Sequence, residues 1–183
     1  YRRKVEKTFK NGGYYIVDLE DGVSVMSMNT LIFNYHQYQP EVGNQAKEHF
    51  DWIEHNLKKK DKKYVMIQHI YPGAVFDTNR DRELKQNWEN DYNERYIDLI
   101  NHNTDQVIIE VAGHDHIEDV RYSKSDDGKF TRNLLVSTGI TANDRQLPGF
   151  STFKVENFVP KDLMEYSLDI TPNYGMTRLP KFD

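Results

Sequence analysis

Near its start the chain alternates apolar and polar residues in two short runs, which predict a β-hairpin. Residues 14–19 and 23–28 each have the pattern of a half-buried strand. Asp21-Gly22 lies between them and is a common pair in tight hairpin turns. We therefore expect two antiparallel strands, preceded by a basic and polar segment over residues 1–13. An irregular aromatic loop is expected to follow over residues 31–38.

The spacing of apolar residues becomes helical in two later segments. One runs from about residue 44 to 58 and the other from residue 88 to about 101, with apolar side chains every three or four positions. Short apolar runs over residues 64–67 and 107–111 follow these helices, and β-branched residues dominate the second run. A strand, a helix and a second strand in this order predict an α/β unit with parallel strands.

Histidines come directly after both apolar runs. Gln68 and His69 follow the first, and Gly113-His114-Asp115-His116 follows the second. Since the carboxyl ends of parallel strands meet at one edge of a sheet, we expect the histidines to gather there. Gly113 permits a close approach that a Cβ would forbid, and side chains two positions apart point to the same side of an extended chain. The pattern indicates a metal site; the alternative is that the rings form hydrogen bonds within turns.

The rest of the chain predicts antiparallel β-structure separated by loops rich in turn-forming residues. Its expected strands cover residues 117–123, 130–137, 150–155 and 163–170. The segment over residues 171–183 has no periodicity, so we expect an irregular tail there. One domain over residues 1–170 accounts for all the predicted elements.

Composition narrows the kinds of ligand that the chain can use. The net charge is −5, with 24 basic and 29 acidic residues well mixed, so no nucleic-acid surface is indicated. The basic cluster over residues 58–63 predicts a solvated helix end, with a phosphate-binding patch as the alternative. The absence of Cys leaves His, Asp, Glu and Asn as metal ligands. No apolar run is long enough for a transmembrane segment.

Taken together and in order, these motifs resemble the C-terminal part of a calcineurin-like metallophosphoesterase of the acid sphingomyelinase-like phosphodiesterase type. The run Gly113-His114-Asp115-His116 matches the family's Gly-His-x-His, and His69-Ile70-Tyr71-Pro72-Gly73 is similar to its His-Ile-Pro-Pro-Gly. The resemblance covers roughly residues 10–170. It implies an α/β fold, the C-terminal portion of a four-layer α-β-β-α sandwich with mixed β-sheets. Residues 1–170 would then be part of a catalytic domain.

The resemblance also implies a reaction and its metal ligands. The expected activity is hydrolysis of a phosphodiester or related phosphoester by water activated by two divalent metal ions, with zinc first and iron or manganese as alternatives. His69 and His114 would bind one ion and His116 the other. The family's remaining ligands and its substrate-facing His belong upstream of Tyr1, so the N-terminal part of the same protein is an expected partner. A secreted or lysosomal/vacuolar location is implied in the same way.

Two positions depart from the family pattern. Gln68 stands where the family usually has Gly, and Tyr71 replaces a Pro. Both are expected to crowd the approach to the site. The departures support a rival interpretation, a catalytically degenerate phosphoesterase fold that acts as a structural or protein-binding module.

Further side chains are candidates for supporting roles at the site. Asp119, with Glu118, could orient a metal-bound imidazole. Tyr71 and Phe76 either shape a substrate pocket or fill the space under a long loop. Asn143 and Arg145 lie in a loop that resembles a site-rim loop, where Arg145 either meets a phosphate or forms a surface salt bridge. The remaining histidines are predicted to lie at the surface or at helix margins: His36, His49, His55 and His102.

Overall fold

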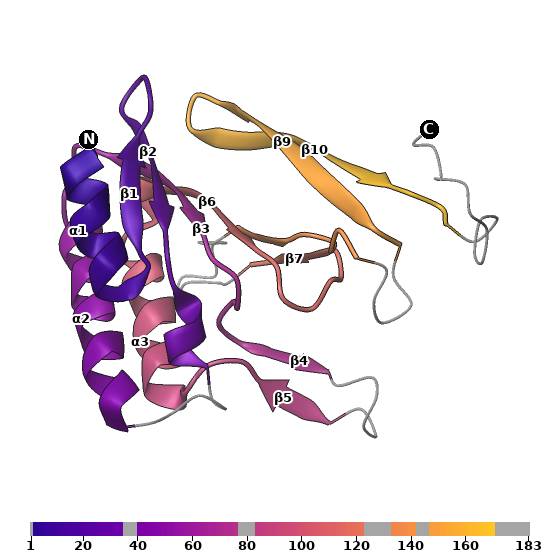
Figure 1. The fold of residues 1–183 in the computed structure, drawn as a ribbon. Helices are drawn as coiled ribbons and strands as arrows, with labels where there is room; N and C mark the ends of the chain where they lie inside the picture. The colour runs from indigo at the N-terminus through magenta and orange to yellow at the C-terminus, as the bar shows by residue number, and fades with distance from the viewer. Residues whose placement is uncertain (1, 35–39, 77–82, 123–132, 142–146, 171–183) are drawn as a thin grey trace.

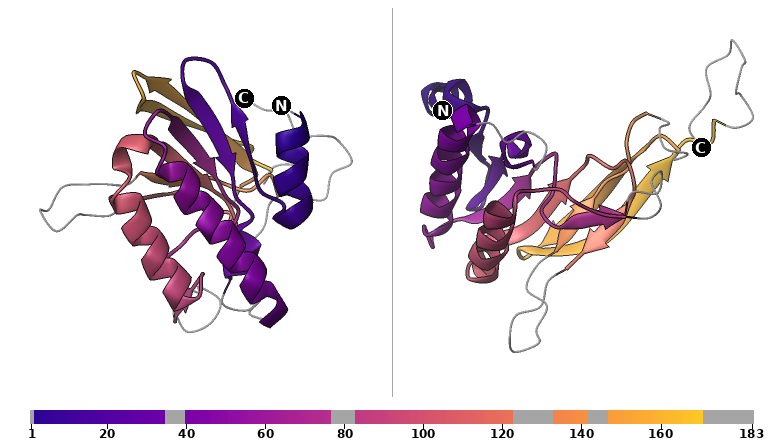
Figure 2. Two further views of the ribbon diagram at one scale, coloured as in Figure 1. Left: turned by 90° about the vertical axis from the view of Figure 1, so that its left-hand side faces the viewer. Right: turned by 90° about the horizontal axis from the view of Figure 1, so that it is seen from below.

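The structure of this chain is a computed structural model that describes residues 2–34, 40–76, 83–122, 133–141 and 147–170. Its centre is a six-stranded mixed sheet with the order β1-β2-β3-β6-β8-β7. Helices cover one face of this sheet, and a separate two-stranded hairpin lies over the other (Figures 1 and 2). The predicted α/β class with a mixed sheet is confirmed.

The inner strands of the sheet run parallel, and an antiparallel strand closes each edge. The pairs β2–β3, β3–β6 and β6–β8 are parallel, whereas β1–β2 and β7–β8 are antiparallel. In sequence order the six strands are β1 (Tyr15–Asp18), β2 (Val23–Ser27), β3 (Lys63–Ile67), β6 (Val107–Ala112), β7 (Asp119–Arg121) and β8 (Leu134–Val136). The predicted N-terminal hairpin and the parallel pairing of the two strands that precede the histidines are both confirmed.

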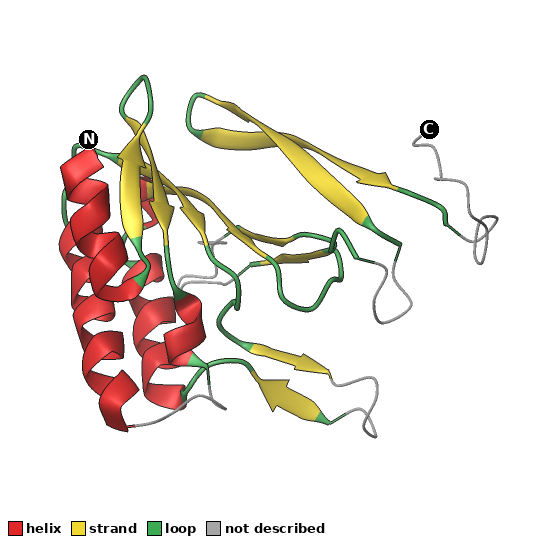
Figure 3. Ribbon diagram, viewed as in Figure 1, coloured by secondary structure: helices red, strands yellow, loops and turns green. Residues whose placement is uncertain are grey.

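Three helices form the layer on one face of the sheet, shown in red in Figure 3. They are α1 (Arg2–Gly12), α2 (Pro40–Leu57) and α3 (Asn90–Asn101). The described residues also include the short 3-10 turns η1 (Thr30–Phe33) and η3 (Thr104–Gln106). The first of these turns occupies the start of the segment predicted to be irregular, and residues 35–38 of that segment lie outside the described part.

Helix α1 was not expected from the sequence. Its apolar stripe is small, because Val5 and Phe9 lie one turn apart and Phe9 is 57% exposed. The helix ends at a left-handed glycine, Gly13, whose amide donates to the Phe9 carbonyl. Helix α2 begins earlier than predicted, at Pro40, because a proline in the first turn has no intrahelical amide bond to lose.

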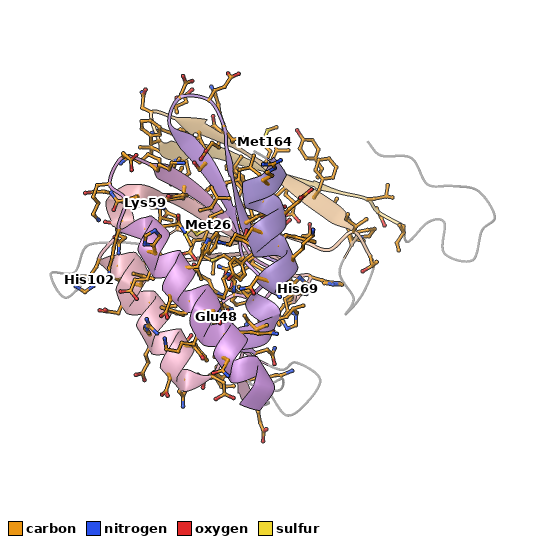
Figure 4. All side chains as sticks on the ribbon, turned by 60° about the vertical axis from the view of Figure 1, so that its left-hand side comes forward. Met26, Glu48, Lys59, His69, His102 and Met164 are labelled. Atoms are coloured by element: carbon orange, nitrogen blue, oxygen red, sulfur yellow. The ribbon has the colours of Figure 1, made fainter. Side chains whose placement is uncertain are left out.

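The main core lies between the sheet and the helices. Alternation along β3 directs Tyr64 and Met66 toward the helix layer, where they are fully buried. Met26 of β2 joins them behind α2 (Figure 4). Burying a side chain of this size contributes about 1.5–3 kcal/mol, so this face of the sheet provides much of the stability.

The opposite face of the sheet packs against a separate hairpin made of β9 (Gly149–Glu156) and β10 (Val159–Ser167). Phe153 and Val155 pack against a buried cluster of the sheet formed by Ile108, Ile109 and Leu135. The outer side of the hairpin is exposed, and Met164 in Figure 4 has 52% of its surface accessible. The last strand, β10, begins earlier than the start of the predicted segment 163–170 and also ends earlier than the end of that segment.

One further strand pairing was predicted from the sequence, and one small hairpin was not. The segments 117–123 and 130–137 do pair antiparallel, as β7 and β8. A small hairpin, β4 (Ala74–Phe76) with β5 (Leu84–Gln86), was not predicted. The expected tail over residues 171–183 lies outside the described part, and no helix among the described residues is long and apolar enough to cross a membrane.

The basic cluster after α2 is used within the fold rather than only solvated. Lys60 donates to the side-chain oxygens of Asn103 and Gln106, at 2.9 and 2.7 Å. Lys62 pairs with Asp18, and Lys63 donates to the backbone carbonyl of Asp105 within η3. These contacts connect the end of α2 with the end of α3 and with β1.

Candidate metal centre

His69 and His114 meet at the carboxyl ends of β3 and β6. Their ring centroids are 5.2 Å apart and the rings are nearly perpendicular. The strand pairing continues past the last strand residues, because the Gln68 amide donates to Val111 at 2.9 Å and the Gly113 amide donates to the His69 carbonyl at 3.1 Å. The two histidine-bearing loops are thus in register, as the predicted parallel pairing implies.

The backbone around this motif is unlike the extended chain that was expected. His114 and His116 have φ values of 87° and 56°, in the left-handed region that costs a non-glycine residue about 1–3 kcal/mol. Gly113 is not the position that needs a missing Cβ, since a Cβ there would make an ordinary contact 3.7 Å from the His69 ring. The expectation that His114 and His116 point to the same side required an extended chain, and these φ values show that the chain is not extended here.

His116 turns toward the segment that follows β8. Its Nδ1 lies 3.4 Å from the hydroxyl of Thr141. A Cβ on Gly139 would come within 2.7 Å of the His116 ring, so glycine is the residue that lets this ring pack there. The two histidines of one short motif therefore face different neighbours.

The imidazole nitrogens of this site are suitable donors for a metal ion. Burial lowers the pKa of the half-buried His114, and the nearby His69 and Lys85 act in the same direction while Asp115 opposes them. The imidazole is thus held in the neutral form that coordinates metals. Within the described ranges no three His, Asp or Glu side chains are grouped closely enough to hold an ion. His69 and His114 fit as two nitrogen donors of a larger donor set.

Gln68 does not crowd this site, which corrects the expectation from the sequence. Its side chain is only 8% exposed and points to the helix side of the sheet, where its amide donates to Glu110 at 3.1 Å. The hydroxyl of Tyr96 donates to the same buried carboxylate at 2.7 Å. The alternation along β3 could have revealed this, because Gln68 is two positions beyond the buried Met66.

Of the two roles left open for Tyr71, the structure supports the filling of space under the loop over a position at the rim of the site. The ring is 1% exposed and packs against the ends of β6 and β8, so it fills space beneath the loop. Its hydroxyl donates to Asp115 and accepts from Arg121. Burial and the bond to Asp115 raise the pKa of Tyr71, which keeps the hydroxyl protonated as the donor.

The other predicted supporting residues lie in varied surroundings. The Asp119 carboxylate accepts from Arg121 at 2.7 Å, and Glu118 shares a hydrogen bond with Glu165 of β10. That bond, together with burial and charge repulsion, raises the pKa of Glu165 to about 7. Among the described residues, neither Asp119 nor Glu118 forms a hydrogen bond with a histidine ring. Asn143, Arg145 and the side chain of Phe76 lie outside the described part.

Of the remaining histidines, His49 contradicts the prediction of a surface or helix-margin position. It is fully buried on the inner side of α2, stacked on Tyr14 at 4.1 Å between ring centroids. His55 and His102 are exposed, as expected, and His36 lies outside the described residues. The apolar stripe of α2 could have placed His49 inside, because it adjoins Phe50 and Ala46 is one turn away.

Comparison with known proteins identifies what the chain is similar to. It is 23% identical over 182 residues to the human cyclic GMP-AMP phosphodiesterase SMPDL3A, an alignment that covers 90% of this chain and 38% of that protein. Sphingomyelin phosphodiesterase B of Dictyostelium discoideum is also 23% identical, over 80% of this chain and 23% of its own length. The chain therefore spans well under half of the curated relatives that it matches.

The fold gives a consistent result. The crystal structure of a dimetal phosphatase from Danio rerio superposes with a TM-score of 0.56 at 10% sequence identity, over 87% of this chain and 62% of that one. No protein-family model matches the chain. The sequence resemblance to sphingomyelinase-like metallophosphoesterases is thus confirmed over part of their length, and the α/β fold is that of a dimetal phosphatase.

Proposed function

We propose that this chain supplies metal-binding histidines to a phosphoester hydrolase that depends on divalent metal ions. The observation that supports this most directly is the approach of His69 and His114 at the carboxyl ends of two adjacent parallel strands. The similarity in sequence to two phosphodiesterases supports the same class of reaction, with a phosphodiester or related phosphoester as substrate.

In this proposal the histidines serve two different ions. His69 and His114 bind one, and His116 binds the second, since the rings of His69 and His114 contact each other whereas the His116 ring packs against Gly139 and Thr141 after β8. Imidazole donors suit zinc, which is the first candidate, with iron and manganese as alternatives. Two such ions supply an activated water nucleophile and stabilise the negative charge that develops on the displaced oxygen.

The rest of the active site is expected from the N-terminal part of the same protein. Residues 1–170 would form the C-terminal part of the catalytic domain, and upstream residues would add the oxygen ligands and the groups that meet the substrate. The family resemblance alone supports a secreted location or the lysosomal or vacuolar lumen.

The test measures metal content and hydrolysis of bis(4-nitrophenyl) phosphate in the full-length protein. Replacing His114 or His116 with Ala is expected to remove different metal ions and to lower hydrolysis by more than about 100-fold, since even groups that only orient ligands contribute about 10–100-fold. His102→Ala is the matched control, because this exposed His caps the far end of α3.

Two results would contradict the proposal. One is a purified protein without a stoichiometric transition metal, and the other is unchanged hydrolysis in both histidine variants. A folded protein with neither metal nor activity would instead favour the rival interpretation of a degenerate phosphoesterase fold that serves as a structural or protein-binding module.

A further inference from the structure

One hydrogen bond connects the two loops that carry the candidate metal ligands. Tyr71 lies two residues after His69, and Asp115 lies between His114 and His116. The Tyr71 hydroxyl donates to the Asp115 carboxylate across these two loops. The contact is direct and shielded, because the tyrosine ring is almost completely buried against β6 and β8.

Arg121 on β7 holds the tyrosine from a third segment of the chain. Its guanidinium carbon lies 4.4 Å from the centre of the Tyr71 ring, and Nη2 donates to the hydroxyl at 3.2 Å. The other two nitrogens are also used, by the Ala74 carbonyl at 2.8 Å and by Asp119 at 2.7 Å. All three guanidinium nitrogens therefore donate a hydrogen bond, which holds the planar group against the Tyr71 ring.

The loop that receives this bond is one that needs an external constraint. His114 and His116 both have left-handed φ angles, which L-residues adopt only where the surroundings impose them. Asp115 stands between the two strained positions. A bond to its side chain acts on the stretch of backbone that decides where both imidazoles lie.

We propose that Tyr71 and Arg121 are positioning residues, which hold the loops of His69 and His114 at the spacing needed for metal binding through the Tyr71–Asp115 hydrogen bond. This inference rests on the proposed function, because it assigns the two residues a role toward the same metal. It also gives a specific purpose to a tyrosine that departs from the sequence pattern of the resembling family.

The alternative role for Tyr71 is structural only, as a buried ring that stabilises the fold. A matched control separates the two roles. Tyr64 is also a fully buried tyrosine, on β3, and its hydroxyl donates to the Asn56 carbonyl at 3.3 Å on the helix side of the sheet. Tyr64→Phe therefore removes a buried hydroxyl from the same region of the fold without touching the histidine loops.

The experiment compares Tyr71→Phe and Tyr64→Phe in the full-length protein, using a Co²⁺ titration followed by visible absorption. Tyr71→Phe is expected to weaken Co²⁺ binding about 10–100-fold, the usual effect of removing a group that orients a ligand. Tyr64→Phe is expected to leave the affinity unchanged. In the metal-free proteins, hydrogen exchange at the Gly113 amide, which bridges the two loops, is expected to accelerate only in Tyr71→Phe.

Two further variants keep the test decisive if Tyr71→Phe folds poorly. Arg121→Lys keeps the charge but loses the stacked plane and the fork of hydrogen bonds, and is expected to weaken Co²⁺ binding to a smaller extent. Asp115→Ala is expected to match Tyr71→Phe, and the double variant is expected to lose no more than either single one, because both remove the same bond.

Additive losses in the double variant would overturn the inference, as would wild-type Co²⁺ affinity in Tyr71→Phe or, where that variant does not fold, in Arg121→Lys. The proposed function fails separately. If His114→Ala binds Co²⁺ as the wild type does, the metal assignment itself is wrong. If His114→Ala loses the metal while Tyr71→Phe keeps it, only the positioning role is refuted.

Discussion

Acidification is expected to destabilise this fold through His49, which is buried between aromatic rings. The imidazole is 0% exposed, and its ring lies 4.1 Å from that of Tyr14 and 5.3 Å from that of Phe33. Neither ring nitrogen makes a hydrogen bond of good geometry within the described part. Burial lowers the pKa of His49 from 6.5 to about 3, with a smaller opposing effect from the backbone of Asn29.

The sign and size of the effect follow from proton linkage. Between pH 6.5 and about pH 3 the unfolded chain binds a proton at His49 that the folded protein does not, so the free energy of unfolding falls as the pH falls. Each pH unit in this interval costs up to about 1.4 kcal/mol, which amounts to about 2 kcal/mol at pH 5 and about 5 kcal/mol over the whole interval. Above pH 6.5 His49 is neutral in both the folded and the unfolded chain, so this loss of unfolding free energy disappears.

Urea unfolding at several pH values between 7.5 and 4.5 measures this slope. His49→Phe keeps a ring between Tyr14 and Phe33 but cannot take up a proton. The pH dependence of its free energy of unfolding is therefore expected to be smaller than that of the wild type, by the contribution of about one proton. His55→Gln, at an exposed position on the same helix, is expected to retain the full slope. An equal pH dependence in His49→Phe and the wild type would show that the buried imidazole is not the source.

Two other predictions concern stability alone and the packing of His116. Tyr96→Phe removes a hydrogen bond to the buried Glu110 carboxylate, so we expect a loss of about 1.5–3 kcal/mol in urea unfolding at neutral pH. Gly139→Ala places a Cβ against the ring of His116, so we expect lower stability and weaker metal binding in the full-length protein. Gly43→Ala, in α2 with open space around it, is the control and is expected to raise stability by about 0.5–1 kcal/mol.

Alternate burial explains why β2 fits a period of two, whereas β6 buries consecutive residues and was predicted from its apolar run. The parallel pairing of β3 with β6 followed from their apolar sequences and the helix between them, and this pairing also brought His69 and His114 together as predicted. Helix α1 was not predicted from the sequence because it buries little apolar surface. The hairpin of β4 and β5 has only three residues in each strand, too few for a pattern to be recognised.

The surroundings of the site depended on contacts between segments far apart in sequence. The partner of Asp115, Tyr71, is 44 positions away in the sequence. Arg121 was not singled out at all, because an arginine on a short strand gives no sign that it will stack on a tyrosine 50 positions earlier. Gln68 was expected to crowd the site because it precedes His69, although the strand alternation already directed its side chain to the other face of the sheet.

The divergence of His114 and His116 changes how the short motif should be interpreted. On an extended strand, positions two apart share a side, so a His-x-His pair would present both imidazoles to one metal ion. Left-handed φ angles at both residues break that rule, and His114 meets His69 while His116 packs beside Gly139. Under the proposed function, the motif would therefore serve two neighbouring ions from one turn, with its strain balanced by contacts such as the bond from Tyr71 to Asp115.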